Sequence, residues 1–279
     1  MQATKKSAAP RRAPRKPRPT GARDPLFNQS VQKAFAILDA FGADRRALNL
    51  GEIAAAVGVT KSSAQRCTHT LERLGLLARD LRIKRWVLTP RTLSMANAYL
   101  SGHPLVEHAT TPLIELNQAT GESVSLSEPD DTDMVFVARF PSHKRFFWHM
   151  PVGRRLPMYC TASGRAFLSA LPAAEAARIV RRSSLRQFTP LTLVNPDVIL
   201  EHVDAARKAG YAWSDQECYR GDVTIAAPVL GDDGLPVAAV NVSAPTSRWK
   251  LAELRAKFSP LLIETARAAG GGIALRLRA

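Results

Sequence analysis

The segment of residues 49–74 limits the possible folds of this chain more than any other stretch, because it predicts two short helices joined by a tight turn. Asn49 can cap the first helix, whose apolar residues recur at helical spacing. Gly58 is expected to end that helix, since glycine tolerates the positive φ that a sharp turn requires. Thr60 can then cap the second helix. With the small residue Ala54, this pattern predicts a helix-turn-helix.

The second of these helices is expected to have an apolar face and a donor-rich face. Its inward residues are predicted to be Ala64, Cys67 or Thr68, Leu71 and Leu74. Its DNA-facing candidates are polar or basic, namely Lys61, Ser62, Ser63, Gln65, Arg66 and His69. Such a face suits the major groove of DNA, although an ordinary helical hairpin with a polar outer face has the same pattern.

The flanking residues favour the DNA-binding alternative. Residues 76–79 and 85–89 predict two short strands around a basic tip, which would form a β-wing. Three basic residues at or just after this tip are further candidates for DNA contact: Arg82, Lys84 and Arg85. Ser30 is expected to cap an upstream helix, whose buried stripe is predicted to contain Val31, Phe35 and Leu38. Together these elements predict a winged helix-turn-helix domain over residues 26–90.

The positive charge of the chain is concentrated in the same region. The net charge is +15, and residues 1–90 hold 18 basic and 6 acidic residues, against 21 and 18 in the remainder. A polyanionic partner such as double-stranded DNA would explain this asymmetry, because phosphate neutralisation releases counterions. A solubility tail is the alternative, since residues 1–25 alone carry eight basic residues.

The N-terminal 25 residues and the cysteines indicate a cytoplasmic protein. Residues 1–25 are rich in Pro, Ala, Lys and Arg, so we expect a disordered basic tail rather than a signal peptide. No segment predicts a membrane span. The cysteines at positions 67, 160 and 218 are widely spaced and are expected to be free thiols. We expect neither a metal site nor a cofactor.

The rest of the chain predicts a linker and a second domain. A linker helix is expected within residues 91–104, either as a subunit contact or as a spacer. A helix over 105–120 is expected to kink or restart at Pro112. Strands are predicted at 123–127, 134–140, 145–150, 224–230 and 237–243. Helices are predicted at 161–170, 172–182, 197–209 and from 247 or 248 to the end. Residues 105–279 should therefore form an α+β domain with a largely antiparallel sheet.

Several ordered motifs resemble the IclR family of bacterial transcription regulators from about Asp24 to Gly272. The first two are the helix-turn-helix with its wing and residues 152–166, VGRRLPMYCTASGRA. GYA at 210–212, with DQE at 215–217, resembles a third family segment. TIAAPV at 224–229 and NVSAP at 241–245 resemble two family strands. The opening RDP at 23–25 and LTPR at 88–91 are most similar to the branch that controls aromatic-acid catabolism.

This resemblance implies a GAF-like effector-binding domain and a dimer, often a dimer of dimers. It implies effector contacts from six residues: Ala162, Ser163, Asp215, Thr224, Asn241 and Ser243. Two of these depart from the common family residues, because Asn241 replaces a serine and Thr224 a cysteine. We therefore expect hydrogen-bonding groups to be retained in a pocket of different shape.

The residues themselves also predict an anion pocket near position 162. A helix start offers backbone N–H groups to a carboxylate. Four arginines are candidates for a carboxylate clamp: Arg139, Arg145, Arg154 and Arg155. Phe146, Trp148 and Met150 share one strand face, which could line an aromatic ligand or simply belong to the core.

We therefore expect a sequence-specific transcription regulator that is controlled by a small organic acid, with an aromatic carboxylate preferred. A ligand-independent architectural DNA-binding protein is the alternative, but residues 105–279 would then have no purpose. An enzyme acting on a small acid is the third candidate. Ser163 is not in a G-x-S-x-G motif and the histidines lack metal-binding spacing, so no catalytic residue is predicted.

Overall fold

The computed structural model describes residues 24–42, 45–143 and 150–271, in two compact units that divide between residues 101 and 102. The expected tail therefore lies almost entirely outside the described residues. Nearly all of the strand expected at 145–150 also lies outside the described residues, and this part includes Arg145, Phe146 and Trp148. No helix in the described part of the chain is long and apolar enough to cross a membrane.

The first unit is a winged helix-turn-helix, as the sequence predicts. Its elements are α1 (Gln29–Asp39), β1 (Ala47–Leu48), α2 (Leu50–Val57), α3 (Lys61–Arg73), β2 (Leu77–Asp80), β3 (Arg85–Leu88) and α4 (Thr92–Leu100). Asn49 and Glu52 form a capping box at the start of α2, and Gly58 ends this helix with φ of +72°. Thr60 caps α3 by accepting a hydrogen bond from the Ser63 N–H. The three strands pair antiparallel in the order β1-β3-β2.

Three expectations about this unit are wrong. Asn28, rather than Ser30, caps α1. Val31 and Phe35 are 51% and 55% exposed, whereas Ile37 is fully buried. Apolar residues follow two overlapping stripes along α1, and the packing of α2 and α3 buries the stripe that contains Ile37. Leu74 is also exposed, because it lies at the C-cap of α3, where the chain turns away.

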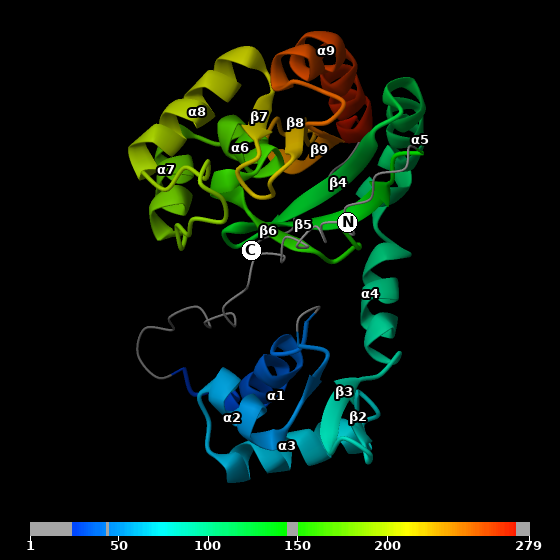
Figure 1. The fold of residues 1–279 in the computed structure, drawn as a ribbon, viewed down its shortest axis with the longest axis vertical. Helices are drawn as coiled ribbons and strands as arrows, with labels where there is room; N and C mark the ends of the chain where they lie inside the picture. Colours follow the sequence, from blue (N-terminus) through cyan, green and yellow to red (C-terminus); the bar gives the residue numbers. More distant parts are fainter. Residues whose placement is uncertain (1–23, 43–44, 144–149, 272–279) are drawn as a thin grey trace, which may run out of the picture. The chain divides into compact units, whose positions relative to one another are not determined.

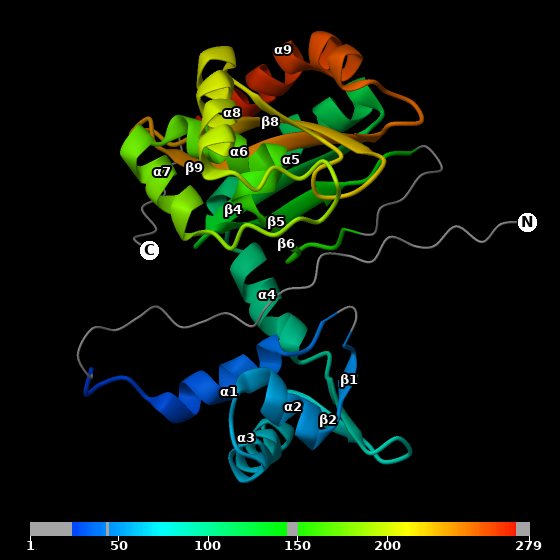
Figure 2. The ribbon, with the colours of Figure 1, turned by 60° about the vertical axis from the view of Figure 1, so that its left-hand side comes forward.

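The second unit is an α+β domain around one antiparallel sheet, which confirms the predicted class (Figures 1 and 2). Its strands are β4 (Ser123–Asp130), β5 (Asp133–Phe140), β6 (Arg155–Pro157), β7 (Ala212–Asp215), β8 (Asp222–Leu230) and β9 (Pro236–Pro245). They pair in the order β6-β5-β4-β9-β8-β7. The sequence predicts neither β6 nor β7, because strands of three and four residues carry too little periodicity.

Helices cover both faces of this sheet. They are α5 (Pro104–Thr120), α6 (Ala162–Ala170), α7 (Ala173–Arg182), α8 (Pro196–Ala209) and α9 (Leu251–Gly270). α5 and α9 pack on one face, and α6 packs on the other with α8 and α7 outside it (Figure 2). α5 continues through Pro112 as one helix, which excludes a restart and leaves the kink as the remaining expectation. α9 begins only at Leu251, and the side chains of Arg248 and Trp249 before it donate hydrogen bonds to the buried Glu122.

Two features fix the start of α6 against its surroundings. Gly164 is required there, since a Cβ at this position would lie 2.1 Å from the Met158 Cα. The buried Arg165 guanidinium makes two hydrogen bonds, of 2.5 and 2.6 Å, to the Glu217 carboxylate. Arg165 Nε also donates to the Tyr159 carbonyl at 3.0 Å. The first turn of α6 is therefore held by packing and by an internal ion pair.

Candidate functional site

The first candidate site is the surface between α3 and the wing. Five of the six α3 candidates are exposed here, namely Lys61, Ser62, Gln65, Arg66 and His69. Ser63 is half-buried, and its N–H is used in the helix cap. Lys84 and Arg79 line the same hollow from the wing. Amide, guanidinium and hydroxyl groups on one helix face can hydrogen-bond to base edges in a major groove.

The wing arginines differ in their surroundings. Arg82 and Lys84 are exposed at the turn between β2 and β3. Arg85 instead donates to both carboxylate oxygens of Glu52, at 2.6 and 3.0 Å, and to the Ala47 carbonyl. The Asn49 backbone N–H and the Arg85 guanidinium lower the pKa of Glu52. Arg85 therefore ties the wing to α2, while Arg82 and Lys84 remain available to phosphates.

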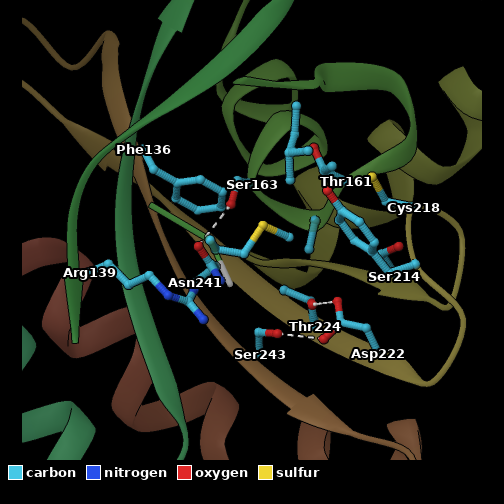
Figure 3. Close-up of a pocket in the computed structure, with 14 residues that line it drawn as sticks. Phe136, Arg139, Thr161, Ser163, Ser214, Cys218, Asp222, Thr224, Asn241 and Ser243 are labelled. Atoms are coloured by element: carbon cyan, nitrogen blue, oxygen red, sulfur yellow. Dashed lines mark hydrogen bonds between the residues drawn. The ribbon is translucent and has the colours of Figure 1, made fainter. Parts of the chain in front are cut away.

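The second candidate site is a small pocket between the start of α6 and the sheet (Figure 3). Its polar lining consists of Arg139, Thr161, Ser163, Ser214, Asp222, Thr224, Asn241 and Ser243. Its apolar lining consists of Phe136, Met150, Leu156, Ala162, Cys218 and Tyr219. The free volume is about 40 Å³. A cavity of about 150 Å³ accepts benzene, so an aromatic ligand would require the lining to move.

The sheet register explains why these polar residues meet. Ser214, Thr224 and Ser243 are direct cross-strand partners on β7, β8 and β9, and Ser123 on β4 continues the row. Because successive residues of a strand point to opposite faces, Asn241 shares the face of Ser243. A row of small hydroxyl side chains thus crosses four strands beneath α6.

Arg139 provides the cation of this pocket. It lies on β5 opposite Ser125, and its guanidinium donates to the Ser125 Oγ at 3.1 Å and the Ser123 Oγ at 3.4 Å. Burial lowers the pKa of Arg139, and the nearby Asp222 opposes this shift. A guanidinium held in this way has further N–H groups with which to bind a carboxylate.

The start of α6 faces the same space. Ser163 Oγ donates to Asn241 Oδ1 at 3.3 Å, and Thr161 Oγ1 accepts from the Gly164 N–H at 3.2 Å. Helix geometry leaves the first-turn N–H groups of Ala162 and Ser163 without intrahelical acceptors. The pocket therefore combines a guanidinium, a helix N-terminus and hydroxyl donors, which together favour an anion.

Asp222 is a pocket residue that the sequence analysis missed. Its carboxylate accepts hydrogen bonds from the Ser243 Oγ at 2.5 Å and from the Thr224 Oγ1 at 2.9 Å (Figure 3). Burial raises its pKa, while the two hydroxyls and Arg139 lower it. Strand alternation counted back from Thr224 could have found it, since residues i and i−2 share a face.

Asp215 does not occupy the place that the resemblance implied. Its side chain is exposed at the end of β7 and accepts a hydrogen bond from the Gln216 side chain. It does not belong to the pocket lining in the described part of the chain. The other five expected effector contacts, Ala162, Ser163, Thr224, Asn241 and Ser243, all line the pocket.

The remaining clamp candidates have other partners or positions. Arg155 binds Asp130 and Asp133. Arg154 donates to the Tyr219 hydroxyl at 3.1 Å, and its buried Nε has no acceptor among the described residues. Among those residues, no three His, Cys, Asp or Glu side chains gather where they could hold a metal ion.

Comparisons with known proteins agree with this architecture. A model of the IclR C-terminal domain of bacterial transcriptional regulators matches residues 97–270, and one of the IclR helix-turn-helix domain matches residues 30–81. The p-hydroxybenzoate hydroxylase transcriptional activator of Acinetobacter baylyi is 34% identical over 241 residues, which cover 85% of this chain and 88% of that protein.

Two solved structures extend the comparison. The crystal structure of an IclR family transcriptional regulator from Brucella abortus aligns with a TM-score of 0.76 at 24% identity, covering 91% of this chain and 95% of that chain. This similarity supports the two-domain fold described above. A double mutant of the PobR inducer-binding domain from Acinetobacter, in complex with 3-hydroxybenzoic acid, is 33% identical. It aligns with a TM-score of 0.52 over 57% of this chain and 93% of that chain.

Proposed function

The chain belongs to the IclR family of bacterial transcription regulators, and from this premise we propose that its effector is a small aromatic carboxylate bound at the start of α6. The observation that carries this proposal is the half-buried Arg139, which faces the pocket together with the N-terminus of α6. Phe136 and Tyr219 supply aromatic walls for a ring. The p-hydroxybenzoate hydroxylase transcriptional activator and the complex of the PobR inducer-binding domain double mutant with 3-hydroxybenzoic acid support this ligand class.

We assign base recognition to Gln65 and Arg66 on α3, because both are exposed and can make paired hydrogen bonds to adenine and guanine, respectively. Lys61, Ser62 and His69 flank them on the same face. Ser63 contributes through the helix cap rather than through its side chain. Arg82 and Lys84 would contact phosphates, whereas Arg85 keeps the wing in place. Because a bacterial transcription regulator acts on DNA in the cytoplasm, we propose that location for this protein.

The regulator would act as a dimer or a dimer of dimers on a pseudo-palindromic operator. One winged helix contacts few base pairs, and paired domains bind half-sites about 10 bp apart or at multiples of that spacing. Exposed apolar residues on α1 and α4 offer surface for a second copy: Val31, Phe35, Leu93, Met95 and Tyr99. None of the residues of α4 is buried in the single chain, as expected for a helix that packs on another subunit.

Calorimetry on the full chain tests the effector proposal. Wild type should bind 4-hydroxybenzoate or 3-hydroxybenzoate more tightly than the uncharged 4-hydroxybenzamide. Arg139→Gln should weaken binding of the acids by about 10–100-fold, because a charge-assisted contact is lost. Arg178→Gln, on the exposed surface of α7, is the matched control. Binding that is equal for acid and amide, or unchanged in Arg139→Gln, would refute the carboxylate anchor.

A further inference from the structure

The pocket carries two opposite charges on different strands. Arg139 comes from β5, and its guanidinium is hydrogen-bonded over β4 to Ser125 and Ser123. Asp222 comes from β8, and its carboxylate is hydrogen-bonded to Ser243 on β9 and to Thr224. Figure 3 shows the two side chains reaching toward the pocket from different sides. A ligand that uses both charges must therefore have two chemically different ends.

The spacing of the two charges determines how a ring could lie between them. Adjacent strands lie about 4.7–4.9 Å apart, and β9 is the next strand to β4. A group held over β4 and one held over the β8–β9 pair are therefore separated by about one to two strand spacings, or roughly 5–10 Å. The carboxylate and hydroxyl oxygens of 4-hydroxybenzoate are roughly 6 Å apart, and a hydrogen bond adds roughly 2.8 Å at each end. The lining must therefore move apart to hold a para-substituted ring between the two charges, as the small free volume of the pocket also requires.

The hydrogen bonds of Asp222 define which group can occupy its end. A carboxylate is acceptor-only and has about four lone-pair sites. Ser243 and Thr224 each donate to a different oxygen, so acceptor capacity remains on both oxygens. A ligand hydroxyl can donate to it, whereas a halogen cannot and a second ligand carboxylate would be repelled.

We propose that Asp222 determines effector specificity by accepting a hydrogen bond from a ring hydroxyl of an acid whose carboxylate is bound by Arg139. Asp222 thereby selects hydroxyaryl monocarboxylates over unsubstituted acids and over dicarboxylates. This inference rests on the proposed effector class and extends it from an anion to an anion with a hydrogen-bond donor at the far end.

Ligand pairs test the inference on the wild-type full chain without any mutation. The probes are 4-hydroxybenzoate, 4-fluorobenzoate, benzoate and terephthalate, which vary only the group at the far end. Calorimetry should give 4-hydroxybenzoate about tenfold or greater preference over 4-fluorobenzoate, which is similar in size but has no donor. Terephthalate should bind most weakly of the four. Equal affinities for the hydroxy and fluoro acids would overturn the inference.

The variant Asp222→Asn adds a second test. This variant keeps the side-chain size but removes the charge. The preference for 4-hydroxybenzoate over 4-fluorobenzoate should therefore fall by about tenfold, and the affinity for terephthalate should rise by a similar factor. Asp215→Asn is the matched control, because Asp215 is an exposed aspartate outside the pocket on the neighbouring strand. Melting temperatures without ligand would identify any folding defect, and the wild-type comparison remains decisive in that case.

The two proposals fail differently. If wild type binds none of the acids, the aromatic-carboxylate proposal is refuted and Asp222 has no ligand to select. If the acids bind in an Arg139-dependent way but Asp222→Asn leaves all affinity ratios unchanged, only the role of Asp222 is refuted.

Discussion

Replacing Arg165 by methionine should destabilise the C-terminal unit more than any surface substitution. Arg165 and Glu217 are 1% and 5% exposed. They form two hydrogen bonds of 2.5 and 2.6 Å. Glu217 would retain the Leu193 N–H at 3.2 Å but would lose its cation. Removing one partner of a buried pair costs about 3–5 kcal/mol, because the remaining charge stays buried and uncompensated.

Urea unfolding of the full chain, followed by tryptophan fluorescence and fitted to two transitions, measures this cost. The double variant Arg165→Met with Glu217→Leu should be more stable than Arg165→Met alone, because no unpaired charge remains. Arg182→Met is the matched control, since the Arg182–Asp131 pair is largely exposed and should contribute less than about 1 kcal/mol. If Arg165→Met costs no more than this control, or if the double variant is the least stable, the reasoning is refuted.

Three further predictions concern DNA binding and assembly. Arg66→Ala should weaken binding to a selected operator by about 1–3 kcal/mol and relax base preference, with Gln65→Ala acting similarly; unchanged affinity in both folded variants would contradict their role. Arg82→Gln with Lys84→Gln should weaken binding to all DNA sequences alike and flatten the salt dependence by about one unit per lost phosphate contact, so an unchanged slope in fluorescence anisotropy would exclude phosphate contact. Sedimentation at micromolar concentration should find at least a dimer for wild type and more monomer for Phe35→Asp, whereas a wild-type monomer with and without DNA would refute the self-association.

The DNA-binding unit was largely predictable from local sequence signals. The capping residues Asn49 and Thr60 and the glycine at 58 each determine a helix end through contacts within a few residues. The burial of α1 was not predictable in this way. Two apolar stripes compete along that helix, and only the packing of α2 and α3 decides that Ile37 is buried and Phe35 exposed.

The pocket was predictable in outline but not in its charges. The resemblance pointed to the start of α6 and to the strands of Thr224 and Ser243, and those residues do line one pocket. It also pointed to Asp215, although Asp222 is the carboxylate that enters the pocket. The difference depends on strand register. β8 begins at Asp222, two residues before the TIAAPV motif at 224–229 that indicates this strand. Register is set by long-range pairing, which the local sequence does not reveal.

An acid bound in the pocket is expected to change the affinity of the protein for DNA. The ligand must favour one arrangement of the subunits over another, and such coupling changes affinity by about 5–150-fold. The direct measurement is operator affinity with and without saturating 4-hydroxybenzoate, for wild type and for Arg139→Gln. We predict a shift within this range for wild type and none for Arg139→Gln, whose operator affinity without the acid should match that of wild type. Equal operator affinity of wild type with and without the acid, at a concentration where calorimetry finds the pocket filled, would contradict a coupling between the pocket and DNA binding.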